Sequence, residues 1–134
     1  MSQENVEVVR LAADAMTQRG LDAFAEYCTD DIDHRPVEGA LDDRGPIHGK
    51  AEMRAYLQDW FDTFDDLRAE PVELIDAGED QVVAVLRLMG RAKLSGVETD
   101  LTYACVYTIR DGKIARGREY WTKEQALEAA GLRE

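Results

Sequence analysis

The sequence IRDGKIARGREYWT, residues 109–122, decides the fold of this chain. Asp111 and Gly112 lie between two apolar runs, and a two-residue hairpin turn needs residues that accept a positive φ at both positions. Thr122 is followed three residues later by Gln125, which is the spacing of a capping box at the start of a helix. The stretch therefore predicts a long antiparallel hairpin that leads directly into a closing helix.

Length and charge limit the classes of protein that the chain can belong to. Its 134 residues are enough for one domain with a buried core, so we expect a single domain over residues 1–134. A net charge of -12 disfavours a nucleic-acid partner, because binding to phosphates needs clustered Lys and Arg. No apolar run is long enough for a membrane span, and residues 1–5 lack the pattern of a secretory leader. We therefore expect a cytoplasmic protein without a membrane partner.

Apolar periodicity predicts helices in the first half of the chain and strands in the second. Helical spacing from Val6 to Met16 indicates a first helix that ends at Gly20, and Asp22 begins a short second helix. A third helix follows Gly49, and after residue 66 the period changes from 3.6 to 2. The predicted strands cover residues 32–37, 68–76, 81–93, 98–110 and 113–121, and Glu38–Gly49 is predicted to be an acidic loop.

This order of elements predicts an α+β fold. Strands joined by short turns form an antiparallel meander, and the helices that precede them cover one face of the sheet. Pro71 cannot donate to a ladder, so its strand is predicted to lie at an edge. A curved sheet wrapped around the N-terminal helices leaves a tapered cavity, where small ligands bind in many proteins.

Several segments resemble the nuclear transport factor 2-like superfamily, specifically its SnoaL-like and ketosteroid-isomerase-like branch. The similar segments are DGKI at 111–114 and REYW at 118–121, with ENVEVVR at 4–10, YCTDD at 27–31 and IHGK at 47–50. The resemblance covers essentially the whole chain and implies a cone-shaped, cystatin-like α+β barrel with a short C-terminal helix. It does not fix the function, because this fold hosts isomerases, dehydratases, cyclases, epoxide hydrolases and non-catalytic binders.

The chain departs from the ketosteroid isomerase pattern at all three chemical groups. The family has its general base, an Asp, immediately before a Pro on the first strand, but here Arg35 precedes Pro36. Its second acid, a carboxyl kept neutral by an apolar site, corresponds to Ala104. The oxyanion Tyr of the first helix has no counterpart among residues 9–16. Steroid isomerisation is therefore not expected.

Strand alternation, combined with the resemblance, predicts which residues face a ligand. The pocket face of the last strand corresponds to Ala115, Gly117, Glu119 and Trp121, and that of the preceding strand to Thr102, Ala104, Val106 and Thr108. The third helix supplies the opposing wall, and the first strand supplies His34 or Arg35, depending on register. A slip of one residue would invert every strand assignment. The predicted ligand-binding residues are Arg35, Tyr56, Trp60, Phe64, Ala104, Val106 and Trp121.

Glu119 and His34 are the predicted catalytic residues. A carboxyl between Trp121 and apolar helix residues would be desolvated, which suits it to proton transfer. His34 can change its charge near neutral pH and act with Glu119 as acid and base. The alternatives are an ion pair of Glu119 with a nearby arginine (Arg87, Arg116 or Arg118) and a solvated His34 beside Asp33.

No motif indicates a cofactor or a metal. There is no Gly-rich nucleotide loop, no His-Glu-x-x-His and no EF-hand spacing. Cys28 and Cys105 lack metal-ligand spacing and are predicted to be small buried thiols. Two functions stay open: an acid-base enzyme (hydratase, isomerase, cyclase or epoxide hydrolase) on a mostly apolar small molecule, or a non-catalytic binding protein with the same pocket.

We also expect a homodimer through the outer face of the sheet. The strand before the last hairpin carries a second row of large side chains, which alternation assigns to the face opposite the pocket. This row comprises Leu101, Tyr103, Cys105, Tyr107 and Ile109. Such a patch is larger than monomers usually expose, and a second copy would cover it in a two-fold dimer. Similar dimers occur in the superfamily that the chain resembles.

Overall fold

The computed structural model of the chain describes residues 2–40 and 45–132, so residues 41–44 of the predicted acidic loop lie outside the described part. The four helices are α1 (Ser2–Arg19), α2 (Leu21–Ala25), α3 (Gly49–Thr63) and α4 (Lys123–Ala129). The six strands are β1 (Cys28–Arg35), β2 (Ile47–His48), β3 (Phe64–Gly78), β4 (Gln81–Ala92), β5 (Glu98–Arg110) and β6 (Lys113–Tyr120). The predicted order of elements is confirmed, with the two-residue strand β2 as an addition within the predicted loop.

All six strands form one curved sheet in the order β2-β1-β6-β5-β4-β3. β3 to β6 form the predicted antiparallel meander, and β3 lies at the edge of the sheet, as Pro71 indicated. β1 pairs with β6 in parallel, so the sheet is mixed rather than wholly antiparallel. A parallel pair needs a long crossover, and the chain between β1 and β6 supplies one through α3 and the meander.

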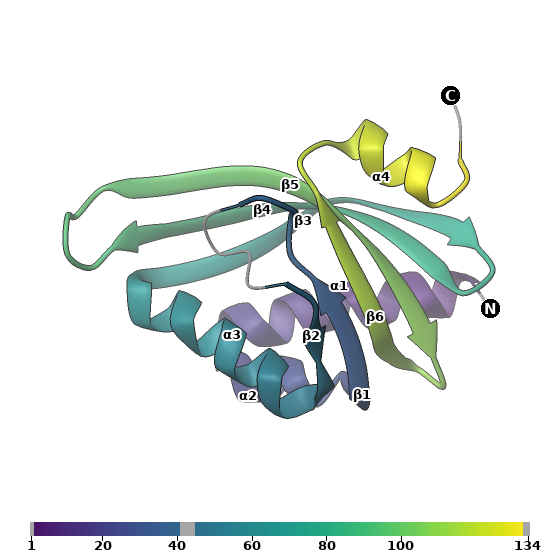
Figure 1. Ribbon diagram of the computed structural model, residues 1–134, viewed down its shortest axis with the longest axis horizontal. Coiled ribbons are helices and arrows are strands. Elements are labelled where there is room, and N and C mark those ends of the chain that lie inside the picture. Colours follow the sequence, from purple (N-terminus) through teal and green to yellow (C-terminus); the bar gives the residue numbers. More distant parts are fainter. Residues whose placement is uncertain (1, 41–44, 133–134) are drawn as a thin grey trace.

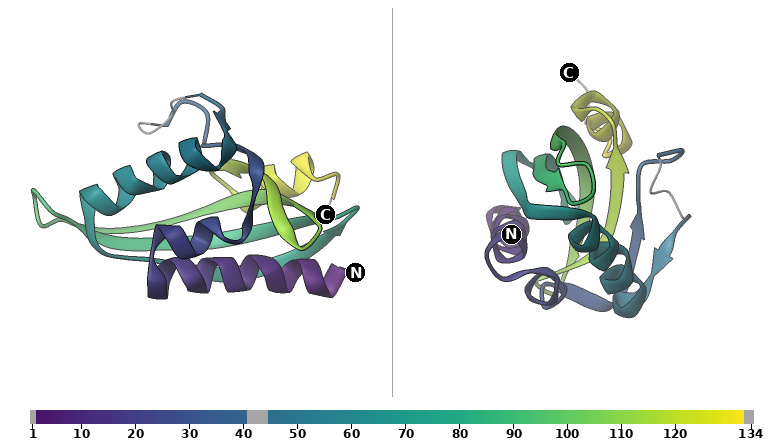
Figure 2. Two further views of the ribbon diagram at one scale, coloured as in Figure 1. Left: turned by 90° about the horizontal axis from the view of Figure 1, so that it is seen from below. Right: turned by 90° about the vertical axis from the view of Figure 1, so that its left-hand side faces the viewer.

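The helices lie on both faces of the sheet, but in unequal numbers. Figure 1 shows α1, α2 and α3 under the concave face, and α4 above the opposite face. The views in Figure 2 show α1 and α3 running along the sheet rather than across its end. The main core lies between the concave face and the first three helices, and a smaller one lies under α4. This arrangement is the predicted α+β fold.

The last hairpin and α4 follow the local signals in the sequence. Asp111 and Gly112 have φ angles of 54° and 76°, as a primed two-residue turn requires. The backbone N–H of Gln125 donates to Thr122 Oγ1 at 3.1 Å, and the backbone N–H of Thr122 donates to Gln125 Oε1 at 3.2 Å. The predicted capping box is therefore confirmed, and it fixes the start of α4.

Removing the cap should destabilise the protein measurably. We expect Thr122→Ala to lower the free energy of unfolding by about 1 kcal/mol, because it leaves the first turn of α4 without its side-chain acceptor. The matched control is Thr102→Ala, an exposed threonine on β5, which should change the free energy by less than about 0.5 kcal/mol. Urea unfolding of the three proteins measures the difference, and equal midpoints would contradict a stabilising role for the cap.

A β-bulge in β6 inverts the predicted alternation of β5. Arg110 pairs with Lys113 and Ile109 with Ile114, but Thr108 pairs with Arg116, so Ala115 is an extra residue in β6. From that point on, Cys105 rather than Ala104 lies opposite Glu119. Residues opposite each other in an antiparallel pair share a face, so the odd-numbered residues of β5 face the helices together with Glu119.

Two predictions are wrong for this reason. Ala104 and Val106 lie on the outer face, where they pack with Ala126 and Leu127 of α4. The apolar row of β5 faces inward, and its members Cys105, Tyr107 and Ile109 belong to the main core. The patch that motivated the dimer is thus covered within one chain. The dimer itself stays a prediction, without that support.

None of the helices described in the structure is both long enough and apolar enough to cross a lipid bilayer.

Candidate functional site

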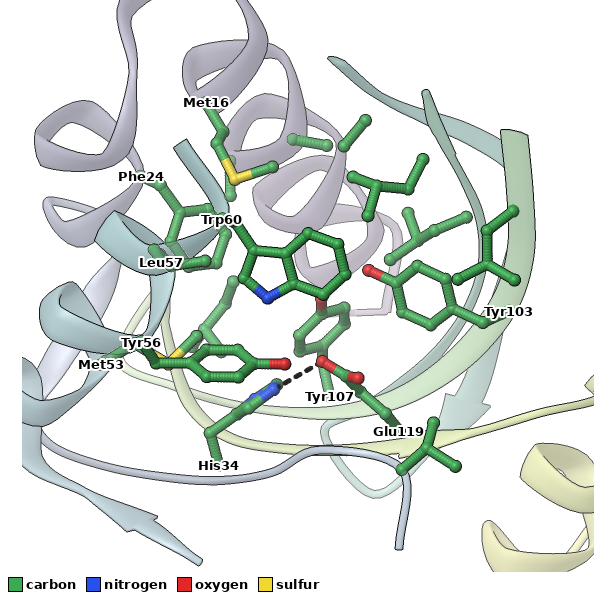
Figure 3. Close-up of a pocket in the computed structure, with 18 of the residues that line it drawn as sticks. Met16, Phe24, His34, Met53, Tyr56, Leu57, Trp60, Tyr103, Tyr107 and Glu119 are labelled. Carbon is green, nitrogen blue, oxygen red and sulfur yellow. Dashed lines mark hydrogen bonds and ion pairs between the residues drawn. The ribbon is translucent and has the colours of Figure 1, made fainter. Parts of the chain in front are cut away.

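A cavity of about 90 Å³ lies between the concave face of the sheet and the helices α1, α2 and α3. Figure 3 shows its walls: Met16 and Phe24 on one side, Trp60 across the middle, and Tyr103 on the sheet. Most of the lining is apolar, and the polar groups gather around His34 and Glu119. An apolar cavity with a few convergent polar groups is the usual form of a small-molecule site.

His34 and Glu119 form a hydrogen-bonded pair in the wall of this cavity. His34 Nε2 lies 2.7 Å from Glu119 Oε2, and the two side chains are 3% and 14% exposed. They come from neighbouring parallel strands, with His34 opposite Gly117 and therefore two residues from Glu119 along β6. Figure 3 shows the contact as a dashed line, with the hydroxyl of Tyr56 directed toward the pair. The structure thus brings together the two residues that the sequence singled out.

The sequence left two alternatives open, an ion pair of Glu119 with a nearby arginine and a solvated His34, and both are wrong. The hydrogen-bond partner of Glu119 is His34, whereas Arg87 forms two hydrogen bonds with Asp100, at 2.6 and 2.8 Å. His34 is buried rather than solvated, and its ring packs near Tyr56 with a centroid distance of 5.9 Å.

Gly117 makes room for the imidazole. A Cβ atom at position 117 would lie 2.6 Å from His34 Nδ1 and 3.2 Å from a ring carbon of Tyr107. Real Cβ atoms essentially never lie within 3.0 Å of another atom, so the imidazole would have to move. The ring of His34 can cover β6 and reach Glu119 only because residue 117 has no side chain.

The surroundings of the imidazole favour one tautomer. His34 Nδ1 is buried and has no hydrogen-bond partner among the described residues. A proton on Nδ1 would be a buried donor without an acceptor, which is costly, whereas a proton on Nε2 can be donated to the carboxylate of Glu119. The geometry therefore favours the tautomer of His34 that donates from Nε2 to Glu119.

Burial also sets the state of the neighbouring tyrosine and of both cysteines. It raises the pKa of Tyr107 well above the ordinary range, and Cys105 and Tyr103 add to the shift, so this phenol keeps its proton at neutral pH. Burial likewise raises the pKa of Cys105 and takes that of Cys28 to about 12. Both cysteines are buried thiols, as predicted, and neither is poised to act as a nucleophile.

The remaining predicted ligand-binding residues divide into three groups. Tyr56, Trp60 and Trp121 line the cavity. Phe64, the first residue of β3, instead stacks on Trp60 with a centroid distance of 5.7 Å and supports this wall from behind. Arg35 lies outside, in a groove described below.

The sequence prediction missed the contribution of α1, α2 and the odd-numbered residues of β5. Val9 and Met16 belong to the helical apolar spacing that predicted the first helix, and both line the cavity. Tyr103 and Tyr107 would have been found only if the bulge at Ala115 had been recognised. The additional lining residues include Val9, Met16, Phe24, Leu101, Tyr103 and Tyr107.

A second, open space of about 740 Å³ adjoins the cavity, and we call it the outer groove. It lies between the segment after β1 and the start of α4, and its lining is more polar. Its lining residues are Arg35, Pro36, Val37, Glu38, Pro46, Arg118, Glu119, Tyr120, Trp121, Gln125, Glu128 and Ala129. In the described part of the chain, three or more His, Cys, Asp or Glu side chains nowhere gather in an arrangement that could hold a metal ion.

Fold and cavity together define a cone-shaped α+β protein with an apolar cavity between its sheet and its helices. The family model of the SnoaL-like domain matches residues 8–117, so the chain belongs to the SnoaL-like family of the nuclear transport factor 2-like superfamily. No curated protein sequence matches it.

Many solved structures share the fold at low sequence identity. A hypothetical protein from Catenulispora acidiphila with a ketosteroid isomerase-like fold, in complex with trimethylamine, is 18% identical with a TM-score of 0.73. The match covers 95% of this chain and 94% of that one. RV0760c from Mycobacterium tuberculosis, in complex with estradiol-17beta-hemisuccinate, is 16% identical with a TM-score of 0.76 and coverages of 89% and 94%. TerC, co-crystallised with polyporic acid, is 21% identical with a TM-score of 0.75 and coverages of 96% and 98%. At such identities the likeness establishes the fold alone.

Proposed function

We propose that the protein is an acid-base enzyme that moves a proton on a small, mostly apolar carbonyl compound. The observation that carries this proposal is the 2.7 Å contact between His34 and Glu119 in the wall of an apolar cavity. A carboxylate in such a place is a competent general base, and water is largely excluded around it. The ligands bound by structures of the same fold support a small-molecule site in general.

In this proposal Glu119 is the catalytic base. Its carboxylate takes a proton from the carbon next to the carbonyl group, and the electron pair of the broken C–H bond moves onto the carbonyl oxygen. The protonated Glu119 then either swaps its proton with one from the solvent and delivers that one to the same carbon, or returns the proton to another carbon of the conjugated system. The first outcome is exchange and the second is isomerisation.

The enolate oxygen needs a hydrogen-bond donor that keeps its proton at neutral pH. Tyr107 lines the cavity and meets that condition, because burial raises its pKa. The hydroxyl of Tyr56 is directed toward the same place (Figure 3). Hydroxyl donors in a buried site stabilise developing negative charge more strongly than water does.

His34 is a positioning residue in this scheme. As a hydrogen-bond donor it holds one oxygen of Glu119, which leaves the other oxygen to face the substrate. This role differs from that of the acid-base partner suggested by the sequence, because His34 itself exchanges no proton with the substrate.

Substitution of His34 separates these two roles. We expect His34→Ala to lower kcat by about a hundredfold, because a base that is misplaced by an ångström loses that much, while KM changes little. His34→Gln should recover part of the loss, because its amide donates from a similar position without titrating. The exposed His48 gives the matched control, since His48→Gln should keep full activity. A His34→Gln variant as poor as His34→Ala would show that the imidazole itself transfers protons.

The reaction class is tested by proton exchange in heavy water. Small ketones such as butanone and cyclopentenone are incubated with the protein, and the loss of proton signal next to the carbonyl is followed by nuclear magnetic resonance. We expect exchange well above the buffer rate. If ketones bind but exchange only at the buffer rate, the protein is a non-catalytic binder or acts on another functional group, and this proposal is wrong.

A further inference from the structure

The cavity is too small to hold a typical substrate on its own. Its volume is about 90 Å³, whereas an engineered cavity that binds benzene has about 150 Å³ and most ligand pockets have about 300–1,000 Å³. A group of a few heavy atoms fits inside without movement of the walls. Any larger substrate must therefore extend out of the cavity.

The outer groove offers the space for such an extension. The cavity and the groove share Val37, Glu119 and Trp121, so the two spaces meet at the proposed base. The groove has a volume of about 740 Å³, which is in the range of ligand sites. A molecule lying across the junction would place its middle, rather than either end, beside Glu119.

Trp121 is the feature of the groove that points to a ligand. Among the large apolar side chains exposed in the described part of the chain, it is the only aromatic one, and it is 49% exposed. The backbone of Trp121 is held in place, because its N–H donates to Gln125 Oε1 at 3.1 Å, within the cap of α4. A half-exposed indole held at the mouth of a site is well placed to stack on a flat ring.

The charges around the groove do not favour an anion. Arg118 has Asp33 at 3.9 Å and Arg35 has Glu38 at 3.6 Å, so each guanidinium lies next to a carboxylate. Glu119 and Glu128 add further negative charge to the lining. The part of the ligand in the groove is therefore expected to be uncharged.

We infer that the cavity and the outer groove form one site for an elongated, uncharged carbonyl compound, with a short apolar end in the cavity and an aromatic ring on Trp121. The carbonyl group then lies beside Glu119. The position of the carbonyl group rests on the proposed function, but the two-part binding site does not.

Calorimetric titration of three ketones tests the inference without requiring turnover. The ketones are butanone, benzylacetone (the same chain with a phenyl ring) and the cyclohexyl analogue of benzylacetone. We expect benzylacetone to bind more tightly than both, and Trp121→Ala to weaken its binding about tenfold, which is a clearly larger factor than for butanone or the cyclohexyl analogue. Trp121→Phe should keep most of the affinity. The control Leu94→Ala, at a fully exposed position of the β4–β5 hairpin, should change nothing.

A second readout locates the ring directly. Trp60 and Trp121 are the only two tryptophans of the chain, so in a Trp60→Phe variant the fluorescence comes from Trp121 alone. Benzylacetone should change this emission with the same Kd that calorimetry gives for that variant. Unchanged emission, or equal losses of affinity for all three ketones in Trp121→Ala, would overturn the inference. Binding that depends on Trp121 but gives no proton exchange would instead uphold it and refute the proposed reaction.

Discussion

Glu119→Gln is expected to lower the rate of proton exchange by about 10²–10⁴-fold, which is the usual contribution of a general base. The amide has nearly the shape of the carboxylate and can still accept a hydrogen bond from His34 Nε2, so the pair should stay in contact. It cannot accept a proton from carbon. Nuclear magnetic resonance in heavy water measures the rate, and calorimetry of the same variant should give a Kd within about tenfold of the parent value.

Two further variants show whether the effect belongs to the carboxylate at this position. Glu98→Gln removes a carboxylate at an exposed position at the start of β5 and should leave the exchange rate unchanged. Glu119→Asp keeps a carboxylate but draws it back from the cavity, so intermediate activity is expected. Full activity in Glu119→Gln would reduce Glu119 to a structural residue and remove the basis of the proposed mechanism.

The place of Glu119 on its strand could be predicted because that strand has clear local signals, whereas the contact with His34 rested on a register that the sequence left open between His34 and Arg35. The turn at Asp111 and Gly112 and the cap at Thr122 fix β6 between them, and the structure confirms both. The number of residues between this turn and this cap placed Glu119 near the end of β6. The fold followed from the same local signals, together with the change of hydrophobic period after the third helix.

The wall of the cavity was harder to predict, because it depends on one inserted residue. The turn alone would place Ala104 opposite Glu119, but the bulge at Ala115 brings Cys105 there instead. Nothing in an Ile-Ala-Arg sequence distinguishes a bulged alanine from a paired one. A single residue thus decided whether Tyr103 and Tyr107 faced a ligand or the solvent.

Gly117→Ala is expected to have an effect far larger than its single added methyl group suggests. The new Cβ would lie 2.6 Å from His34 Nδ1, on a strand that is paired on both sides, with β1 and with β5. The imidazole should therefore rotate or shift away from Glu119. We expect proton exchange to fall about as far as in His34→Ala, and overpacking to reduce the free energy of unfolding by about 1–3 kcal/mol.

A double-mutant cycle with His34→Ala attributes this effect to the predicted contact. If the added methyl group acts by displacing the imidazole, it should cost little stability in a chain whose residue 34 is already alanine, apart from its 3.2 Å approach to Tyr107. The two substitutions should then be far from additive in both the free energy of unfolding and the exchange rate. Additive losses would mean that Gly117 matters for the backbone of β6 rather than for His34. Non-additive losses would show that Gly117, because it has no side chain, helps to position His34 and through it Glu119.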